Sequence, residues 1–260
     1  MEARYCLPMP IIAFVHTKGG VGKTTGSIHV ASDLHSRGYK TLLVDCDHTT
    51  RSTSSFAAVA ANARQDALSI TSAAHVSYVA RLSNDYDWTV VDSRPATIAK
   101  TGELDDDLFL ETLWVADFLA VSVLPSPTDV WNMTRPGGFL TLLRRALKLK
   151  PTLRAGVFLN MADDGLEARE AAGMLSDWNL PVLPSLRRLT DFKRSLRFGQ
   201  GLAQWKPESA AAKQVHALTG EIVRHVQEVS ASTDDRPSCT SRSGSGGLPI
   251  CDADGLAAAG

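Results

Sequence analysis

Short runs of apolar residues, each continuous rather than alternating with polar positions, punctuate the chain. Such runs are typical of strands that are covered on both faces, as in a parallel sheet. Between them lie segments in which apolar residues recur at helical spacing, for example Ile28, Ala31 and Leu34. The pattern therefore predicts buried strands that alternate with helices, an α/β arrangement. The predicted strands cover residues 11–15, 40–47, 87–95, 118–124, 155–160 and 180–183.

Two helices are delimited most clearly. The first ends near Arg37, because Gly38 has the residue type favoured just past a helix C-terminus. The last covers about residues 208–229 and has an apolar stripe suited to packing on the sheet. Residues 49–84 are rich in Ser, Thr and Ala with mixed helical spacing, and we expect helices that cover the sheet there.

Composition indicates one large domain over residues 10–229, since 44% of the 260 residues are hydrophobic and can form a full core. Residues 1–9 show no pattern and include a second methionine, Met9, so we expect either a poorly ordered leader or an upstream start and assign them no role. Residues 230–260 are rich in Ser, Gly, Asp and Pro with almost no large apolar side chains, and we expect a disordered tail.

Charge and cysteine content exclude several classes of protein. The formal net charge is −1, so affinity for nucleic acid or a membrane has to come from local patches. The four cysteines form no CxxC pair, which favours a reducing compartment over a disulfide framework. No apolar run approaches the roughly 20 residues of a membrane span. We therefore expect a cytoplasmic protein without a membrane partner.

A glycine-rich loop separates the first predicted strand from the first helix. Gly19, Gly20 and Gly22 let the main chain curl with its N–H groups pointing inward, and the following helix adds its positive N-terminal dipole. Such a nest binds polyphosphate, with the Lys23 ammonium on the β- and γ-phosphates and the Thr24 hydroxyl on Mg²⁺. The alternative is an ordinary glycine-rich turn, which needs neither the lysine nor the threonine.

The loop sequence Lys-Gly-Gly-Val-Gly-Lys-Thr-Thr resembles the deviant Walker A loop of the ParA/MinD group of P-loop ATPases. The resemblance implies a single P-loop domain whose mostly parallel, doubly wound sheet has helices on both faces. It also implies that Lys18 reaches across an ATP-bound homodimer to the partner's nucleotide and takes part in catalysis. The nucleotide-binding residues that it implies are Lys18, Gly19, Gly20, Val21, Gly22, Lys23, Thr24 and Thr25.

Two of the predicted strands end in carboxylates. Ligands bind beyond the carboxyl ends of parallel strands, so Asp45, Asp47 and Asp92 are expected at the same sheet edge as the loop. By the resemblance, Asp47 positions the attacking water and Asp92 holds Mg²⁺ as a Walker B acid. Asp47 has the alternative of capping the next helix. His48 and Arg94 depart from the group's usual prolines and glutamine.

Asn160 ends a further strand, where the resemblance implies a contact with adenine and the alternative is a turn residue. Two basic clusters follow the strands. The spacing of Arg188, Phe192 and Gly199 resembles the C-terminal part of partition ATPases, where the region contributes to DNA binding. The DNA-binding candidates are Arg144, Arg145 and Lys148 in the first cluster and Arg188, Lys193, Arg194 and Arg197 in the second.

The first functional hypothesis is a ParA-type ATPase that segregates plasmid or chromosomal DNA. It binds Mg·ATP, dimerises, associates with the nucleoid by coating DNA without sequence preference, and is released by hydrolysis that a ParB-like centromere-binding protein and DNA stimulate. A MinD-like membrane-cycling ATPase is the second, although residues 230–260 contain no amphipathic basic helix. A nucleotide-binding scaffold with weak or lost hydrolysis is the third, and His48 and Arg94 are its support.

Overall fold

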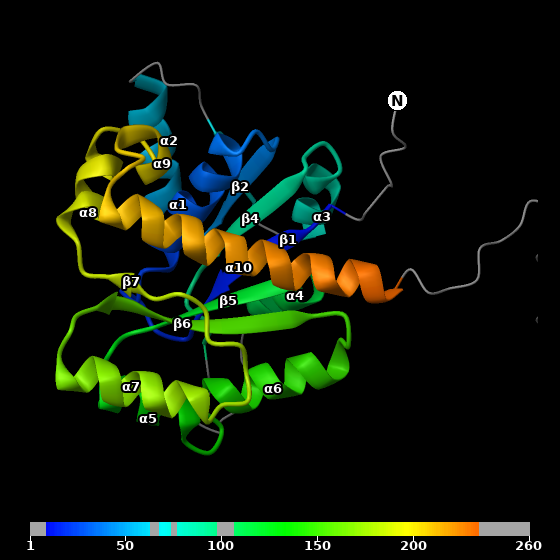
Figure 1. Ribbon diagram of the computed structural model, residues 1–260. Helices are drawn as coiled ribbons and strands as arrows, with labels where there is room; N and C mark the ends of the chain where they lie inside the picture. The colour runs from blue at the N-terminus through cyan, green and yellow to red at the C-terminus, as the bar shows by residue number, and fades with distance from the viewer. Residues whose placement is uncertain (1–8, 63–67, 74–76, 98–106, 234–260) are drawn as a thin grey trace, which may run out of the picture.

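The computed structural model describes residues 9–62, 68–73, 77–97 and 107–233, and these form a seven-stranded sheet in the order β3-β2-β4-β1-β5-β6-β7 (Figure 1). All strand pairs are parallel, as the apolar runs predicted. The strands are β1 (Ile11–Val15), β2 (Thr41–Cys46), β3 (Ser69–Ser72), β4 (Trp88–Ser93), β5 (Phe118–Val123), β6 (Arg154–Ala162) and β7 (Leu186–Arg187).

Strand β1 shows why the central strands have no polar face. Its side chains alternate between two cores, with Ala13 and Val15 in one and Ile12 and Phe14 in the other. All five residues of β1 are buried. Because helices cover both faces of the sheet, apolar side chains predominate on both sides of the central strands. The α/β fold class predicted from the sequence is therefore confirmed.

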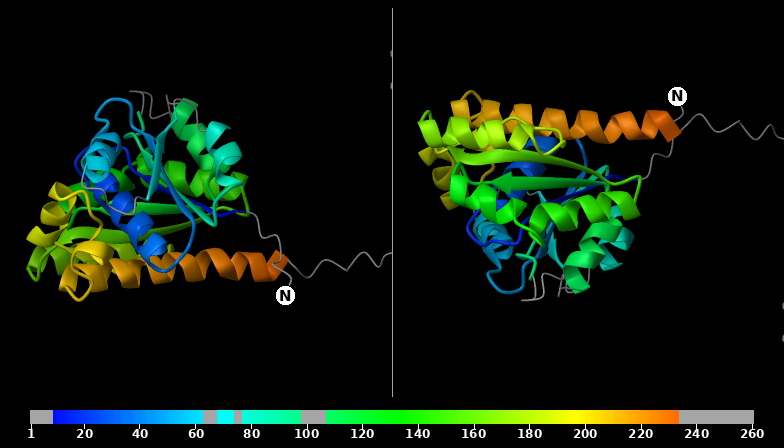
Figure 2. Two further views of the ribbon diagram at one scale, coloured as in Figure 1. Left: turned by 90° about the horizontal axis from the view of Figure 1, so that it is seen from above. Right: turned by 90° about the horizontal axis from the view of Figure 1, so that it is seen from below.

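The helices form two layers, one on each face of the sheet (Figure 2). One layer packs its apolar side chains with Ala13 and Val15, and the other packs with Ile12 and Phe14. The first layer contains α3 (Ser77–Ser83), α4 (Asp107–Val115), α5 (Pro127–Thr134), α6 (Phe139–Leu149) and α7 (Leu166–Ser176). The second contains α1 (Lys23–Ser36), α2 (Ser52–Asn62), α8 (Thr190–Arg197), α9 (Leu202–Trp205) and α10 (Ala210–Thr233).

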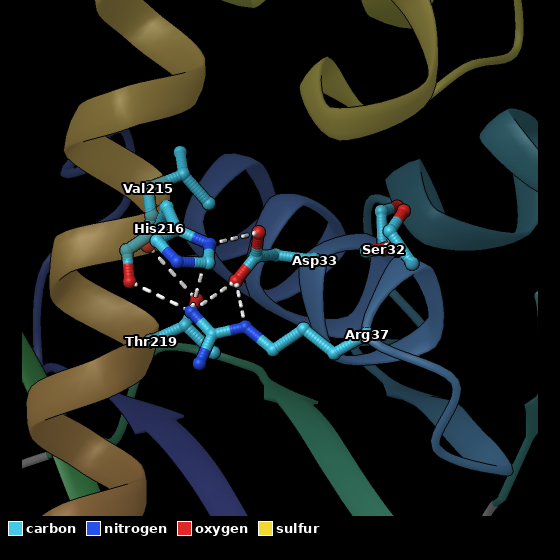
Figure 3. A network of polar contacts seen from close by, with 7 residues as sticks. Ser32, Asp33, Arg37, Val215, His216 and Thr219 are labelled. Atoms are coloured by element: carbon cyan, nitrogen blue, oxygen red, sulfur yellow. Dashed lines mark hydrogen bonds and ion pairs between the residues drawn. The ribbon is translucent and has the colours of Figure 1, made fainter. Parts of the chain in front are cut away.

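A polar network fastens α1 to α10 beside this second core (Figure 3). The buried Asp33 carboxylate accepts a hydrogen bond from Arg37 Nε at 2.9 Å, and its other oxygen lies 3.2 Å from His216 Nδ1. Arg37 Nη2 also donates to the His216 carbonyl at 2.8 Å. Both oxygens of the buried Asp33 carboxylate therefore have a polar partner, which offsets the free-energy cost of removing them from water.

Three boundaries differ from the sequence prediction. Residues 49–84 contain a strand, β3, besides α2 and α3. The strand predicted over residues 180–183 is wrong, because only an isolated bridge between Val157 and Val182 forms there and the last strand is β7. Helix α10 extends past residue 229 to Thr233. Most of the predicted leader and tail, residues 1–8 and 234–260, lies outside the described residues.

Candidate nucleotide site

The glycine loop lies between β1 and α1, at the carboxyl edge of the sheet. Gly20 and Gly22 have φ angles of 77° and 89°, in the region that disfavours side chains. A Cβ at Gly22 would also meet Asn160 Nδ2 at 1.9 Å. Gly22 is the N-cap of α1 and offers no side-chain cap, so the N–H groups of the first turn are left for another acceptor. This geometry suits an anion at the helix N-terminus.

The two loop lysines lie in different surroundings. Lys23 is buried, with 6% of its surface exposed, and its Nζ donates to the Lys18 carbonyl across the loop at 3.2 Å. Burial lowers the Lys23 pKa, and the charges of Asp92 and Asp47 act in the opposite direction. The Lys18 side chain is 53% exposed and pairs with Asp129 Oδ1 at 2.5 Å. Only Lys23 therefore faces the interior of its own site.

His16 supports the loop from beneath. Its Nδ1 accepts a hydrogen bond from the Lys18 N–H at 2.8 Å, and its Nε2 lies 3.2 Å from Met133 Sδ. The ring stacks on Phe139 with the centroids 5.5 Å apart. Burial, followed by the charge of Lys23, lowers the His16 pKa to about 4. The imidazole is therefore neutral at pH 7, and because Nδ1 accepts, the proton lies on Nε2.

Asp92 ends β4 beside the loop and has the properties of a metal ligand. Thr53 Oγ1 donates to its Oδ2 at 2.8 Å, whereas Oδ1 has no hydrogen-bond partner in the part of the chain that the structure describes. Burial raises the Asp92 pKa to about 6, although the hydroxyls of Thr24 and Thr53 favour the charged form. Mg²⁺ binds one or two carboxylates together with substrate phosphates, so Asp92 and Thr24 fit this ion.

Asp45 and Asp47 form hydrogen bonds to the chain that follows β2. Asp47 Oδ1 accepts from the N–H groups of Thr49 and Thr50 at 3.1 and 3.2 Å, and its Oδ2 accepts from Thr50 Oγ1 at 2.9 Å. Asp45 Oδ2 accepts from the Ser54 N–H and hydroxyl, at 2.9 and 2.7 Å. Asp47 therefore stabilises the turn before α2, and its role toward water stays a prediction.

Asn160 contacts the loop itself. Its Nδ2 donates to the Val21 carbonyl at 2.7 Å, and its Oδ1 accepts from the Met161 N–H at 3.0 Å. Only 5% of the residue is exposed. Asn160 therefore fixes the position of Val21 in the loop. Its contact with adenine stays a prediction.

The two basic clusters belong to opposite layers of helices. The first lies on α6, which buries Phe139 and Leu143 in the core shared with α4 and α7. The second lies on and before α8, which buries Phe192 in the core shared with α1 and α10. The two clusters thus lie on helices that pack against opposite faces of the sheet. The exposed basic side chains of the second are Arg188, Lys193, Arg194 and Arg197.

Several residues around the loop carried no signal in the sequence. His16, Thr53 and Asp129 meet the loop or Asp92 only because the chain folds β1, α2 and α5 around one edge of the sheet. Neither Thr53 nor Asp129 lies in a motif. The position of His16 directly after a buried strand is the one available cue.

Comparison with known proteins places this site in a family. Residues 12–202 match the model of the CobQ/CobB/MinD/ParA nucleotide binding domain. The chain belongs to this family. The MinD and ParA members of this family are P-loop ATPases. The predicted resemblance to the ParA/MinD group is thus confirmed.

Individual family members share the fold at low sequence identity. Maintenance of carboxysome distribution protein A of Halothiobacillus neapolitanus is 26% identical over 217 residues, which are 82% of this chain and 95% of that protein. The septum site-determining protein MinD of Pyrococcus horikoshii, complexed with Mg-ADP, has a TM-score of 0.62 at 17% identity, covering 85% of this chain and 98% of its own.

A plasmid partition protein from Borrelia burgdorferi has a TM-score of 0.59 at 14% identity, covering 84% of this chain and 100% of its own. These structural likenesses concern the fold. In the described part of this chain, no helix is both long enough and apolar enough to cross a bilayer.

Proposed function

We propose that this chain is an ATPase that dimerises around Mg·ATP, binds DNA without sequence preference and uses hydrolysis to position a cargo on it. The contrast between its two loop lysines carries the proposal. Lys23 is buried within reach of the charges of Asp92 and Asp47, whereas Lys18 points away from that site toward Asp129 with about half of its side chain exposed. One lysine is placed for the chain's own nucleotide and the other for a nucleotide held by a second copy.

The proposed division of roles follows the chemistry of phosphoryl transfer. Loop N–H groups and Lys23 bind the phosphates, and Thr24 with Asp92 hold Mg²⁺, which when bound neutralises charge on the transferring group. Asp47, whose charge acts on Lys23, orients the attacking water. Asn160 keeps the loop in the conformation that receives the phosphates, through its hydrogen bond to Val21.

The DNA surface of this proposal is the α8 cluster. Arg188, Lys193, Arg194 and Arg197 are exposed, while Asp191 is the acidic residue in the first turn of α8. Several cations on one short helix match a phosphate backbone and carry no information about bases. Such binding is driven by release of counterions and falls steeply with salt.

The proposal has two forms, which differ in the kind of cargo. In the first, the cargo is a plasmid or chromosome and a ParB-like centromere-binding protein stimulates hydrolysis, as the Borrelia burgdorferi partition protein suggests. In the second, the cargo is a large protein assembly, as the name of the Halothiobacillus neapolitanus relative suggests. Deleting the gene in its source organism separates them, because loss of plasmids or chromosomes supports the first and clustering of a protein compartment supports the second.

Turnover and assembly of purified protein test the proposal directly. We expect wild-type protein to hydrolyse ATP, to double its mass by light scattering when Mg·ATP is added, and to shift DNA of any sequence only in that state. ATP binding without dimerisation or turnover would support a nucleotide-binding scaffold instead. ATP-dependent sedimentation with anionic vesicles and no DNA binding would support the membrane-cycling alternative.

A further inference from the structure

A groove separates α4 from α6 on the outer surface of the first helix layer. It encloses about 450 Å³ and has a mainly apolar lining. Trp114 and Leu149 are 62% and 64% exposed on it, and Leu110 is 40% exposed. The described lining residues are Leu110, Leu113, Trp114, Gly137, Thr141, Leu142, Arg145, Ala146, Leu149, Lys150 and Leu153. A contiguous apolar surface of this kind marks an interaction site.

The charges in the groove have one sign. Arg145 is exposed and has no ion-pair partner among the described residues. Lys150 Nζ donates to the carbonyls of Trp114 and Ala116 at 2.7 and 2.5 Å, so it is fixed at the C-terminal end of α4, where the charge of the neighbouring Asp117 also acts on it. Arg145 is therefore the main charge that the groove offers to a ligand. None of the described lining residues is acidic. An apolar ligand with carboxylates complements this surface, and one with basic groups does not.

We propose that the groove binds an acidic amphipathic segment of a partner protein. Apolar side chains of the segment pack between α4 and α6, and its carboxylates pair with Arg145 and lie near Lys150. Trp and Arg are the residue types that most often dominate interfaces, and Trp114 and Arg145 lie on the two sides of the groove. A helix that lays an apolar stripe into such a groove is a common mode of recognition.

The position of the groove keeps it clear of the nucleotide site. Trp114 lies in the last turn of α4, shortly before the amino end of β5, and Leu149 and Lys150 lie shortly before that of β6. The loop and Asp92 follow the carboxyl ends of β1 and β4. Trp114 and Leu149 therefore lie toward the edge of the sheet opposite the loop, and a segment held on them stays away from the nucleotide site. Gly137 extends the lining toward Phe139, which stacks on His16. This docking site is additional to the proposed function and stands without it.

A random peptide library tests the proposal on the full chain. Peptides about 16 residues long, enough to span α6 as a helix, are selected on wild-type protein and counter-selected on Leu149→Glu. We expect the enriched sequences to combine bulky apolar residues at helical spacing with Asp or Glu. Leu149 is exposed, so this variant folds, and unchanged ATP affinity by titration confirms that its nucleotide site is intact.

A pair of charge reversals on α6 then tests the electrostatic part. Arg145 lines the groove and Lys148, also exposed on α6, does not. By fluorescence anisotropy, an enriched acidic peptide should bind Arg145→Glu at least about tenfold more weakly than wild type and bind Lys148→Glu within about twofold of wild type.

Four results would overturn the proposal. These are no enrichment above the Leu149→Glu background, enrichment of basic or uncharged peptides, equal losses in the two charge-reversal variants, and enrichment of the chain's own sequence from Leu248 to Asp254. The last result would assign the groove to a segment of this chain instead of a partner.

Discussion

Lys18 Nζ lies 2.5 Å from Asp129 Oδ1, so the exposed lysine of the loop is paired with helix α5 of its own chain. The same helix contacts the loop a second time, through Met133 and His16. Asp129 is only 13% exposed at its side chain, whereas Lys18 is 53% exposed. In the proposed dimer, Lys18 has to leave Asp129 before it reaches the partner's nucleotide.

Asp129→Asn should therefore favour dimerisation. A partly exposed ion pair contributes about 0.2–1 kcal/mol, and each of the two subunits loses one such pair on dimerisation. Removing the pair should therefore lower the protein concentration for half-maximal ATP-dependent dimerisation by up to about thirtyfold. Light scattering across a concentration series measures this. Glu221→Gln is the matched control, because it removes an exposed pair with Arg224 on α10, in the helix layer on the other face of the sheet from α5. Weaker dimerisation in Asp129→Asn would instead make Asp129 part of the dimer surface.

Lys23→Ala should abolish nucleotide binding. The variant loses the buried cation of the site and leaves the phosphate charge without its main charge-assisted donor. Isothermal titration with Mg·ATP makes the comparison, and Lys18→Ala is the control, since we expect that variant to bind ATP and yet remain monomeric. Affinity like that of wild type in Lys23→Ala would refute the assignment of the loop to phosphate binding.

Asp47→Ala should separate binding from turnover. Ground-state binding rests on the loop amides and Lys23, whereas hydrolysis also needs an oriented water, so we expect a loss of about a hundredfold or more in rate with little loss of affinity. Phosphate release and titration measure the two. Because Asp47 also stabilises the turn at Thr49 and Thr50, thermal unfolding is recorded in parallel. If Asp47→Ala hydrolysed ATP at the wild-type rate, the role of Asp47 would be limited to stabilising the turn.

Asp92→Asn should stabilise the protein in the absence of metal at high pH. Burial holds the Asp92 pKa at about 6, above its ordinary value of 3.8. The folded state therefore retains a proton that the unfolded state has lost, and stability falls as pH rises from about 4 to 6. Urea unfolding at pH 8 should show a gain of up to about 3 kcal/mol.

At about pH 3, below both pKa values, both states of wild type are mostly protonated, so most of the stabilisation by Asp92→Asn should disappear there. Destabilisation by the same amount at both pH values would show that Asp92 contributes through its hydrogen bond from Thr53 and not through its charge.

Reversing the α8 cluster should weaken DNA binding for every sequence alike. With Arg188, Lys193, Arg194 and Arg197 replaced by Glu, we expect the slope of log affinity against log salt to fall by about 0.9 for each DNA phosphate that the protein no longer neutralises. Gel shifts at several salt concentrations measure it. Reversal of Arg144 and Lys148, which lie on α6 in the opposite layer, is the control. Losses confined to this control would move the DNA surface to α6.

The central sheet could be predicted because its signals are local. A strand buried on both faces is a continuous apolar run, and β1, β2, β4, β5 and β6 all appear as such runs. The edges lack this signal. Strand β3 has the sequence Ser-Ile-Thr-Ser and is only partly buried, and β7 has two residues, which is too short for any periodicity.

In the candidate site, too, the parts that could be predicted are those with a local sequence signal. Loop residues 18–25 are adjacent in sequence, and their residue types are dictated by the phosphate nest. The supports of the loop come from distant positions, as when Asn160 bonds the carbonyl of Val21, or when Asp129 pairs with Lys18. Only the order in which strands lie in the sheet brings such residues together.

Strands β2 and β4 pair so that Asp45 lies directly opposite Asp92. A shift of one residue in either strand would turn its carboxylate to the other face of the sheet and into a helix layer. We therefore expect insertions and deletions inside these strands to displace the carboxylates and abolish the site. The connections that follow the strands should tolerate changes in length. The pairing register of β2 and β4 therefore sets how far Asp92, the proposed metal ligand, lies from the loop, and engineered variants of this chain should keep that register unchanged.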